Sequence, residues 1–342
     1  MSDTAASQHR SLVEAMALQS VLPLWDRYKS ILTREPQPVD PFIWSWEKMA
    51  PLVERAALEI NMPEAERRVL LLSHPEFSGT INTSSTLSAG LQILNPGETA
   101  PPHRHTLAAL RLVMMGNGAE TITDGKPCPM APGDLILTPA WTWHEHRHTG
   151  NERMVWFDGL DYPLTRSLGT MFFEPHPEPG WDTHLQTISD DALGEGGVLP
   201  ADAGGAPYSR LFRYPWARVR DALQATAPLA DGSRRIRYVN PASGGPVMPT
   251  IDCFALRLGS APTQPMRTSS TAIAVAIEGE GQTRIGDEVL TWRQHDVFTL
   301  PRWRWIEHTQ RKGPATLFLM TDRSLMEKIG QLREETTPDA NV

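Results

Sequence analysis

Two stretches of the sequence decide its fold. Residues 101–118 read PPHRHTLAALRLVMMGNG, and residues 133–148 read GDLILTPAWTWHEHRH. Each joins short apolar runs to turn residues, a pattern typical of β-strands connected by tight turns. Histidines gather at the start of the first stretch and at the end of the second. The segment that indicates a sheet therefore also carries the densest groups of titratable side chains in the chain.

The same pattern of short apolar runs continues on both sides of these stretches. We expect strands at residues 69–72, 91–94, 110–114, 120–123, 135–138 and 154–157. Their length and spacing predict an antiparallel barrel or sandwich. A second strand-rich block follows at residues 236–320.

Helices are expected only at the two ends of the chain. Apolar residues recur at helical spacing from Met49 to Ile60, and Pro63 follows the last of them. Residues 12–28 are interpreted as an earlier helix, and residues 324–333 as a last one. The fold is therefore predicted to be dominated by β-structure, with flanking N-terminal and C-terminal helices.

The two strand-rich blocks repeat each other. Gly116-Asn-Gly118 matches Gly279-Glu-Gly281 at an offset of 163 residues, and Pro139-Ala-Trp141 matches Pro301-Arg-Trp303, as His146 matches His308, at an offset of 162. A duplication of domain size predicts two barrels of one architecture. The expected organisation is a helical region at 1–67, a first barrel at 68–174, a connecting region at 175–235, a second barrel at 236–335 and a disordered tail at 336–342.

Composition excludes several classes of protein. The 342 residues are 40% hydrophobic and carry a formal net charge of −8, without any run of Lys or Arg. This balance argues against a nucleic-acid partner. The chain shows neither a run of about 18 apolar residues nor the apolar core of a secretory signal, so we expect a cytoplasmic protein without a membrane span. Cys128 and Cys253 indicate neither a disulfide framework nor a zinc site.

The histidines form a candidate metal site. Residues i and i+2 of a strand point to the same side, so His103 and His105 share one space. His144 opens the other histidine group and is the expected third ligand. Three neutral imidazoles leave open positions on an octahedral ion, as an oxygen-activating iron requires. An HxH pair alone is a weak signal, because polar histidines on a sheet face are common.

The spacing of these residues resembles the cupin family. Gly97, His103, His105 and Gly116 follow its first motif, and Gly133, Pro139 and His144 follow its second. The glutamate ligand of the general cupin pattern is replaced by Ala109, which indicates a site of three histidines. In the second repeat the three ligand positions hold Met266, Thr268 and Ile306. We therefore expect a bicupin, in the form of two double-stranded β-helix barrels, with one iron per chain and a metal-free second barrel.

Longer segments resemble one group of cupins more closely. These are Leu91-Gln92 with Gly97, PPHRHT, GDLILTPAWTWHEH, the VWFDGLD run ending at Asp161, and YVNPASGGPVMPT at 238–250. They are similar to the gentisate 1,2-dioxygenase family, which includes salicylate and 1-hydroxy-2-naphthoate dioxygenases, over residues 20 to 335. The resemblance implies a homotetrameric enzyme with Fe(II) in the N-terminal barrel.

The resemblance also implies roles for individual residues. His103, His105 and His144 match the iron ligands, and Arg111 matches an arginine that binds the substrate carboxylate. Gln92 and His146 match polar residues around substrate and O2, and Asp158 matches an acidic residue of the same pocket. Independently, Arg111 keeps the strand parity of His105 and stands among apolar neighbours, and a guanidinium suits a carboxylate. Structural roles remain open for His146, Asp158 and Gln92. Trp141 and Trp143 are interpreted as barrel packing.

The reaction implied is the opening of an aromatic ring by O2. Both oxygen atoms enter between the carboxyl-bearing and the hydroxyl-bearing carbons, in gentisate or in a 5-substituted salicylate such as 5-nitrosalicylate or a halosalicylate. Ser88 stands where the family often has a bulky aromatic residue, and Arg147 adds positive charge, so a 5-substituted salicylate fits these residues as well as gentisate does. The alternatives are 1-hydroxy-2-naphthoate, a β-diketone or thiol dioxygenase, and a non-enzymatic ligand-binding bicupin.

Overall fold

The computed structural model describes residues 3–37, 39–176 and 206–337. By its internal contacts the chain divides into two compact units, Met1–Pro38 and Val39–Val342. The first unit contains α1 (Asp3–Leu18) and α2 (Leu24–Ile31). A single helix over residues 12–28 was therefore the wrong expectation. Pro23 directly precedes α2, and Ser20 has a left-handed backbone with φ of 57°, so the chain turns between the two helices.

The second unit begins with short elements. These are β1 (Ile43–Trp44), α3 (Trp46–Glu59), α4 (Met62–Ala65) and the 3₁₀ turn η1 (Pro75–Phe77). The predicted helix at residues 49–60 is confirmed as α3. Its apolar stripe is buried at Val53, Ala56 and Ala57, which explains why this segment is helical without strong caps.

Two sheets form the first strand-rich half. One has the order β12–β8–β5–β10–β3–β2, and the other has the order β11–β4–β9–β6–β7. All six predicted strands are present in them. The strands are β2 (Val69–Leu71), β3 (Ser88–Leu94), β4 (Thr99–His105), β5 (Ala109–Met115), β6 (Ala119–Thr123), β7 (Lys126–Met130), β8 (Leu135–Thr138), β9 (His144–His148), β10 (Met154–Leu160), β11 (Phe173–Pro175) and β12 (Arg213–Tyr214).

A single nine-stranded sheet forms the second half, with the central order β1–β18–β16–β19–β14–β13. Apart from β1, whose bounds are given above, the strands of this sheet are β13 (Arg234–Tyr238), β14 (Asp252–Arg257), β15 (Met266–Thr268), β16 (Ala272–Ile285), β17 (Glu288–Arg293), β18 (Val297–Leu300), β19 (Ile306–Thr321) and β20 (Glu334–Thr336). The strands β16 and β19 are long and bulged, whereas their counterparts in the first half are divided into β5 with β6 and β9 with β10. In the part of the chain that is described, the strand pairings form bent sheets and no closed ring.

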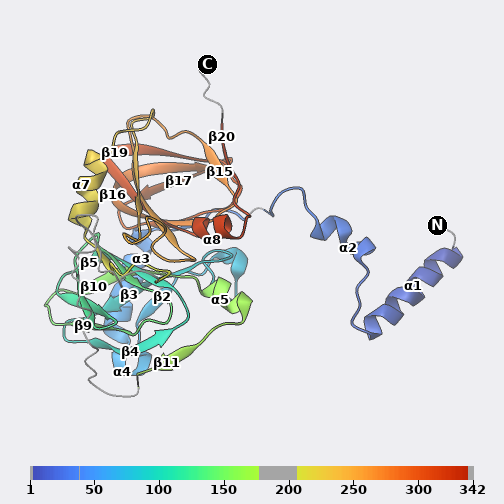
Figure 1. Ribbon diagram of the computed structural model, residues 1–342, viewed down its shortest axis with the longest axis horizontal. Coiled ribbons are helices and arrows are strands. Elements are labelled where there is room, and N and C mark those ends of the chain that lie inside the picture. Colours follow the sequence, from blue (N-terminus) through green and yellow to red (C-terminus); the bar gives the residue numbers. More distant parts are fainter. Residues whose placement is uncertain (1–2, 38, 177–205, 338–342) are drawn as a thin grey trace. The chain divides into compact units, whose positions relative to one another are not determined.

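The repeated glycines explain part of the shared architecture. Gly116 and Gly279 have φ of 88° and 75°, and a Cβ atom would lie 2.1 Å from Arg153 O at the first and 2.2 Å from Pro314 O at the second. Only glycine fits a backbone that is both left-handed and this close to another chain segment. The duplication inferred from the sequence is therefore present in the backbone: each half is a cupin, and the chain is a bicupin (Figure 1).

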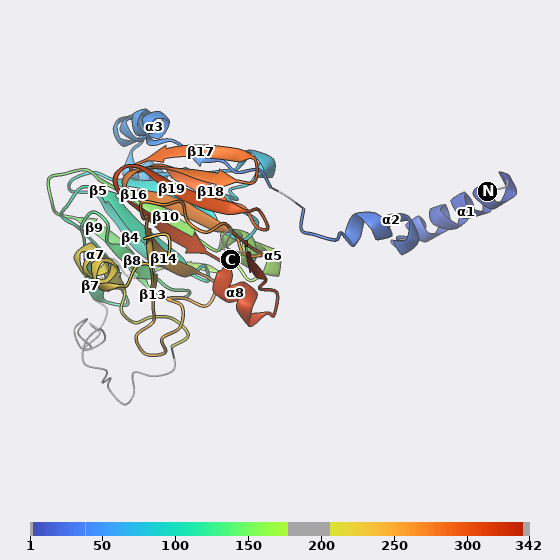
Figure 2. The same cartoon turned by 90° about the horizontal axis from the view of Figure 1, so that it is seen from above.

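Each cupin receives an edge strand from the segment that precedes the other cupin. The strand β1 pairs with β18, and the following Trp46 N–H donates to Asp296 Oδ1 at 2.6 Å. In the same way β12 pairs with β8, and the Trp216 N–H donates to Asp134 Oδ1 at 2.8 Å. The helix α7 (Trp216–Ala225) then packs beside β13 and β14 (Figure 2). The two cupins are thus interlocked rather than merely tethered.

One apolar core is shared by both cupins. It combines the outward face of the six-stranded sheet with side chains of β14, β16 and β19, and Phe157 packs edge-on against Phe318 with ring centres 6.5 Å apart. A second cluster of apolar residues fills the interior of the C-terminal cupin. Burial of this much apolar surface stabilises a fixed arrangement of the two cupins within this unit.

The chain ends differ from the sequence expectation. The last helix was expected over residues 324–333, but α8 covers only Arg323–Lys328, and Gly330 follows with φ of 71°. Residue Thr336, placed in a disordered tail, belongs to β20 and pairs with Met266, while residues 338–342 lie outside the described ranges. The connecting region at 175–235 contains β12, α7 and the start of β13, and its residues 177–205 are likewise outside these ranges. Every described helix is too short or too polar to span a membrane.

Candidate active site

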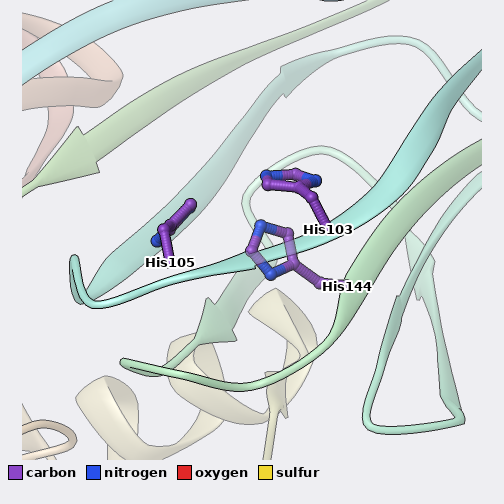
Figure 3. A group of neighbouring side chains, drawn as sticks. All are labelled: His103, His105 and His144. Carbon is purple, nitrogen blue, oxygen red and sulfur yellow. The ribbon is translucent and has the colours of Figure 1, made fainter. Parts of the chain in front are cut away.

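Three histidines meet inside the N-terminal cupin. His103 and His105 lie on β4, and His144 begins the neighbouring β9, where it pairs in register with His103. One ring nitrogen from each lies within 4.8 Å of the others, and all three side chains are buried. Figure 3 shows the three rings turned toward a common space from these two strands. The geometry thus agrees with the expectation that His103 and His105 share one side of a strand and that His144 joins them.

Backbone carbonyls orient each of the three rings. The Nδ1 atoms of His103, His105 and His144 lie 3.1, 3.0 and 3.0 Å from the carbonyl oxygens of Pro101, Leu107 and Thr142. When Nδ1–H donates to such a carbonyl, the Nε2 lone pair is left available for a metal ion. His144 Nε2 is fully buried and has no hydrogen-bond partner. A buried acceptor without a partner is costly, so this atom fits a metal ligand.

Electrostatics keeps the three rings neutral. Burial lowers the pKa of His103 to about 2 and the pKa of His105 to about 4, and the charges of Arg67 and Arg111 contribute to the lowering. Burial likewise lowers the pKa of His144 well below its usual range. Neutral imidazoles are the form that binds a metal.

The structure offers one such group among the residues it describes. Ala109 is buried on β5 and supplies no ligand atom where the general cupin pattern has glutamate. In the second cupin the corresponding Met266 pairs with Ile306, so apolar side chains occupy two of the three places. The donor set of three neutral nitrogens therefore fits one divalent transition metal in the N-terminal cupin.

A buried ion pair accompanies the histidines. Arg111 and Asp158 face each other in register on β5 and β10, with Nε 3.4 Å from Oδ1. Arg111 Nη1 also donates to Thr138 Oγ1 at 2.7 Å. Burial raises the pKa of Asp158, and the neighbouring Arg111 charge opposes that rise. Because Arg111 is 4% exposed and its Nε has no hydrogen-bond partner, it is a buried donor prepared for a further acceptor.

The sequence analysis missed Arg67. Its Nη2 lies 2.5 Å from His103 Nδ1 and 3.1 Å from Pro101 O. The first contact is a hydrogen bond only if Nδ1 accepts, whereas metal binding through Nε2 places a proton on Nδ1. A bound metal therefore favours Pro101 O as the partner of His103 and leaves the Arg67 guanidinium to another acceptor. Arg67 lies just before β2, in a segment without the apolar periodicity that would have indicated on which side its side chain lies.

Other predicted residues border the same space. His146 Nδ1 is 2.9 Å from Thr121 Oγ1, and its buried Nε2 has no partner. Gln92 Nε2 is also buried without a partner, and Gln92 pairs in register with Trp156, whose ring lies 5.2 Å from that of His146. Several polar atoms without partners near one metal group are typical of a site for a polar ligand.

Two residues considered for substrate choice differ in environment. Ser88 is buried at the start of β3, and strand alternation places it on the same side as Gln92. Arg147, expected to add charge at the entrance, donates to Glu145 Oε1 at 2.6 Å, so its charge is largely balanced. Of the two, Ser88 is the better placed to shape a pocket.

Fold and site together define a cupin with a buried group of three histidines that could hold a metal ion, next to a buried arginine. Comparison with known proteins agrees: residues 90–160 match the cupin domain model. A gentisate 1,2-dioxygenase of Aquipseudomonas alcaligenes is 35% identical over 96% of both chains. A 5-aminosalicylate 1,2-dioxygenase of Comamonas is 34% identical over 95% of this chain and 89% of its own.

The salicylate 1,2-dioxygenase of Pseudoaminobacter salicylatoxidans, solved as an adduct with gentisate, superposes with a TM-score of 0.91 at 30% identity. The match covers 97% of this chain and 94% of that one. The chain belongs to the gentisate and salicylate 1,2-dioxygenase family. It is an enzyme of the ring-cleaving dioxygenase class, which inserts two oxygen atoms, and the non-enzymatic reading of the bicupin is set aside.

Proposed function

We propose that this enzyme uses Fe(II), held by His103, His105 and His144, to open the ring of gentisate or of a 5-substituted salicylate. The observation that carries the proposal is the buried Arg111, whose charge contributes to lowering the pKa of all three histidines. A divalent metal next to a fixed cation suits a ligand with a carboxylate and an adjacent hydroxyl. A β-diketone or thiol substrate would offer Arg111 no carboxylate beyond its contacts with Asp158 and Thr138, and its buried Nε would stay without a hydrogen bond, which is costly.

The protein groups would bind and orient the substrate. Arg111 donates to the substrate carboxylate, and Arg67, once turned away from His103, is the second cation within reach. Asp158 fixes the Arg111 guanidinium and limits the positive charge that must be buried in the absence of substrate. Gln92 and His146 present polar atoms without partners beside that space, where they would hold the hydroxyl proton and polar oxygen atoms. Bound Fe(II) would supply the redox chemistry that lets O2 react with an aromatic ring.

Ser88 supports a proposal for the substrate class. Ser88 leaves room, and a hydroxyl group, where a bulky side chain would exclude a ring substituent. We therefore propose that the substrate carries a group at position 5, such as hydroxyl, nitro or halogen. The bond broken lies between the carboxyl-bearing and hydroxyl-bearing carbons, and both atoms of O2 enter the product. A fused-ring 1-hydroxy-2-naphthoate is the alternative that the same small residue would admit.

Oxygen uptake tests the proposal. The protein is reconstituted anaerobically with Fe(II) and assayed with gentisate, salicylate, 5-nitrosalicylate, 5-chlorosalicylate and 1-hydroxy-2-naphthoate. We expect one iron per chain and the highest kcat/KM with a 5-substituted compound. His105→Ala should lose iron and activity, whereas Thr268→Ala, the matched change in the second cupin, should keep both. Iron binding that is lost equally in the two variants would contradict the assignment.

The family resemblance implies a homotetramer and the composition led us to expect a cytoplasmic protein, and we propose both for this enzyme. Light scattering coupled to size exclusion measures the mass in solution directly. A mass close to that of a single 38.0 kDa chain would contradict it.

A further inference from the structure

A cavity of about 880 Å³ lies in the C-terminal cupin, on the side of the sheet where the metal would sit in the first cupin. Met266, Thr268 and Ile306, which replace the three histidines, are part of its wall. The rest is mainly apolar and includes Phe254, Leu256, Leu300 and Leu319. A space of this size and lining is typical of small-molecule sites rather than of a packed barrel interior.

Arg235 is an exposed cation on the cavity wall, which also holds the charged residues Asp231, Glu307, Arg323 and Glu334. It lies on β13, and its guanidinium carbon is 4.3 Å from the centre of the Phe254 ring. Within the described ranges Arg235 has no ion pair and no side-chain hydrogen bond. The carboxylates that act most on its charge, Glu334 and Asp252, are engaged by other arginines, because Glu334 accepts from Arg323 at 2.7 Å and Asp252 accepts from Arg237 at 2.8 Å. A cation stacked on a ring keeps its N–H edge free for an acceptor.

His308 adds a directional polar group. It occupies the place that His146 has in the first cupin, and its Nδ1 lies 2.8 Å from Thr283 Oγ1, as His146 Nδ1 lies 2.9 Å from Thr121 Oγ1. The second cupin has thus lost its metal ligands but keeps this threonine–histidine pair facing its cavity. Thr268 and Ser270, which are 3.0 Å apart, add hydroxyl groups to the same wall.

We propose that the C-terminal cupin is a second, metal-free binding site for a small organic carboxylate with an apolar body. The carboxylate pairs with Arg235 through two parallel N–H···O bonds, the geometry that a guanidinium favours. The apolar body packs against Phe254, Leu256 and Leu319, and His308 meets a polar substituent where the ligand has one. This site requires neither iron nor the reaction of the first cupin, so it stands independently of the proposed function.

Calorimetric titration of the full-length, iron-free protein tests the proposal. The probes are octanoate and 1-naphthoate, compared with their uncharged counterparts 1-octanol and 1-naphthol. Octanoate has no hydroxyl next to its carboxylate and is therefore a poor ligand for the first cupin. We expect one octanoate per chain, at least tenfold weaker binding of the alcohols, and at least tenfold weaker octanoate binding in Arg235→Gln. Arg111→Gln should leave octanoate binding unchanged.

Two further variants make the test decisive. Arg284→Gln removes an exposed cation from the same cupin and should bind octanoate as the parent does. Ala272→Leu places extra atoms in the cavity without changing Arg235 and should also lose octanoate binding. The melting temperature shows whether Arg235→Gln folds, and if it does not, Ala272→Leu replaces it in the test. The proposal is overturned if neither carboxylate binds at millimolar concentration, if folded Arg235→Gln binds octanoate like the parent, or if Arg111→Gln alone abolishes binding.

Discussion

Arg104 in the first cupin and Arg267 in the second are held in the same way between two tryptophans. The Arg104 guanidinium lies 4.3 and 4.5 Å from the ring centres of Trp141 and Trp143. Arg267 lies 4.4 and 5.0 Å from those of Trp303 and Trp305. Each arginine also pairs with a glutamate of the adjoining edge strand, Glu174 or Glu335. The same arrangement of arginine and tryptophans is present in the C-terminal cupin, which has no metal ligands, so its basic role is structural.

In the first cupin the same arrangement lies next to the proposed metal ligands. Arg104 lies between His103 and His105 in sequence, and the Trp141 N–H donates to His105 O at 2.7 Å. We predict that Arg104→Ala weakens Fe(II) binding about tenfold, as loss of a supporting contact commonly does, and lowers the free energy of unfolding by about 1–2 kcal/mol. Arg267→Ala should lose similar stability and keep its iron. Ferrous titration and urea unfolding of both variants measure this. Equal iron loss in the two would mean that the effect is a general loss of stability.

Arg111 and Arg67 are predicted to act on substrate rather than on iron. Arg111→Gln and Arg67→Gln should each lower kcat/KM by about 10- to 100-fold, mainly through KM, because each removes a charge-assisted hydrogen bond of about 1.5–3 kcal/mol. The iron content should stay at one per chain. Arg111→Gln also strands the buried Asp158 carboxylate, which costs stability.

The double variant Arg111→Gln/Asp158→Asn separates these two effects. It should recover melting temperature relative to Arg111→Gln without recovering KM. A recovery of both would show that Arg111 acts only by holding the fold. Steady-state oxygen uptake and thermal melts of the three proteins decide between the two roles.

The sequence could predict those parts of the site that depend on local periodicity. The two-residue period of β4 brings His103 and His105 together, and the same period turns Arg111 inward on β5. Motif spacing identified His144. Arg67 was beyond such reasoning, because its contact with His103 joins β4 to a segment that carries no apolar pattern. The partner of Arg111 was equally hidden, since Thr138 reaches it only through the pairing of β5 with β8.

The repeat predicted two cupins but not how they join. The pairing of β1 with β18 and of β12 with β8 depends on β1 and β12, which have two residues each and are too short to give a signal. Two of the stretches that resemble the family carry no metal ligand, and the structure gives them a role that the sequence alone did not reveal. Thr250 Oγ1 donates to Asp161 Oδ2 at 2.6 Å, so two of the stretches that resemble the family connect the halves. The cavity around Arg235 is lined by Met266, Thr268 and Ile306, which a search for metal-ligand motifs registers only as missing histidines.

Acid should weaken the fold through His308. Burial, together with the nearby Arg235 charge, lowers the pKa of His308 from 6.5 to about 4. The folded state therefore binds its proton less readily than the unfolded state, so the stabilising contribution is complete above pH 6.5 and is lost as the pH falls from there toward 4. A shift of this size makes the loss about 2 kcal/mol between pH 7 and pH 5.

Urea unfolding of iron-free protein at the two pH values measures this contribution. His308→Gln should show a drop in stability between pH 7 and pH 5 that is smaller than the drop of the parent by about that amount. His9→Gln, a change at an exposed histidine, should retain the slope of the parent. An unchanged slope in His308→Gln would show that other buried histidines account for the acid sensitivity.

Ser88 should govern which ring substituents are accepted. Ser88→Phe fills the space on the Gln92 side of β3, so we predict that kcat/KM for 5-nitrosalicylate falls at least tenfold relative to that for salicylate. Steric discrimination at one pocket position is commonly about 1–3 kcal/mol, which is sufficient for such a change. Ser88→Ala keeps the space and should alter the ratio little, unless the hydroxyl itself contacts the substituent. Iron content and melting temperature establish that both variants fold. If Ser88→Phe lowers the two values in equal proportion, Ser88 does not line the part of the pocket that receives position 5, and the substituent must be recognised elsewhere.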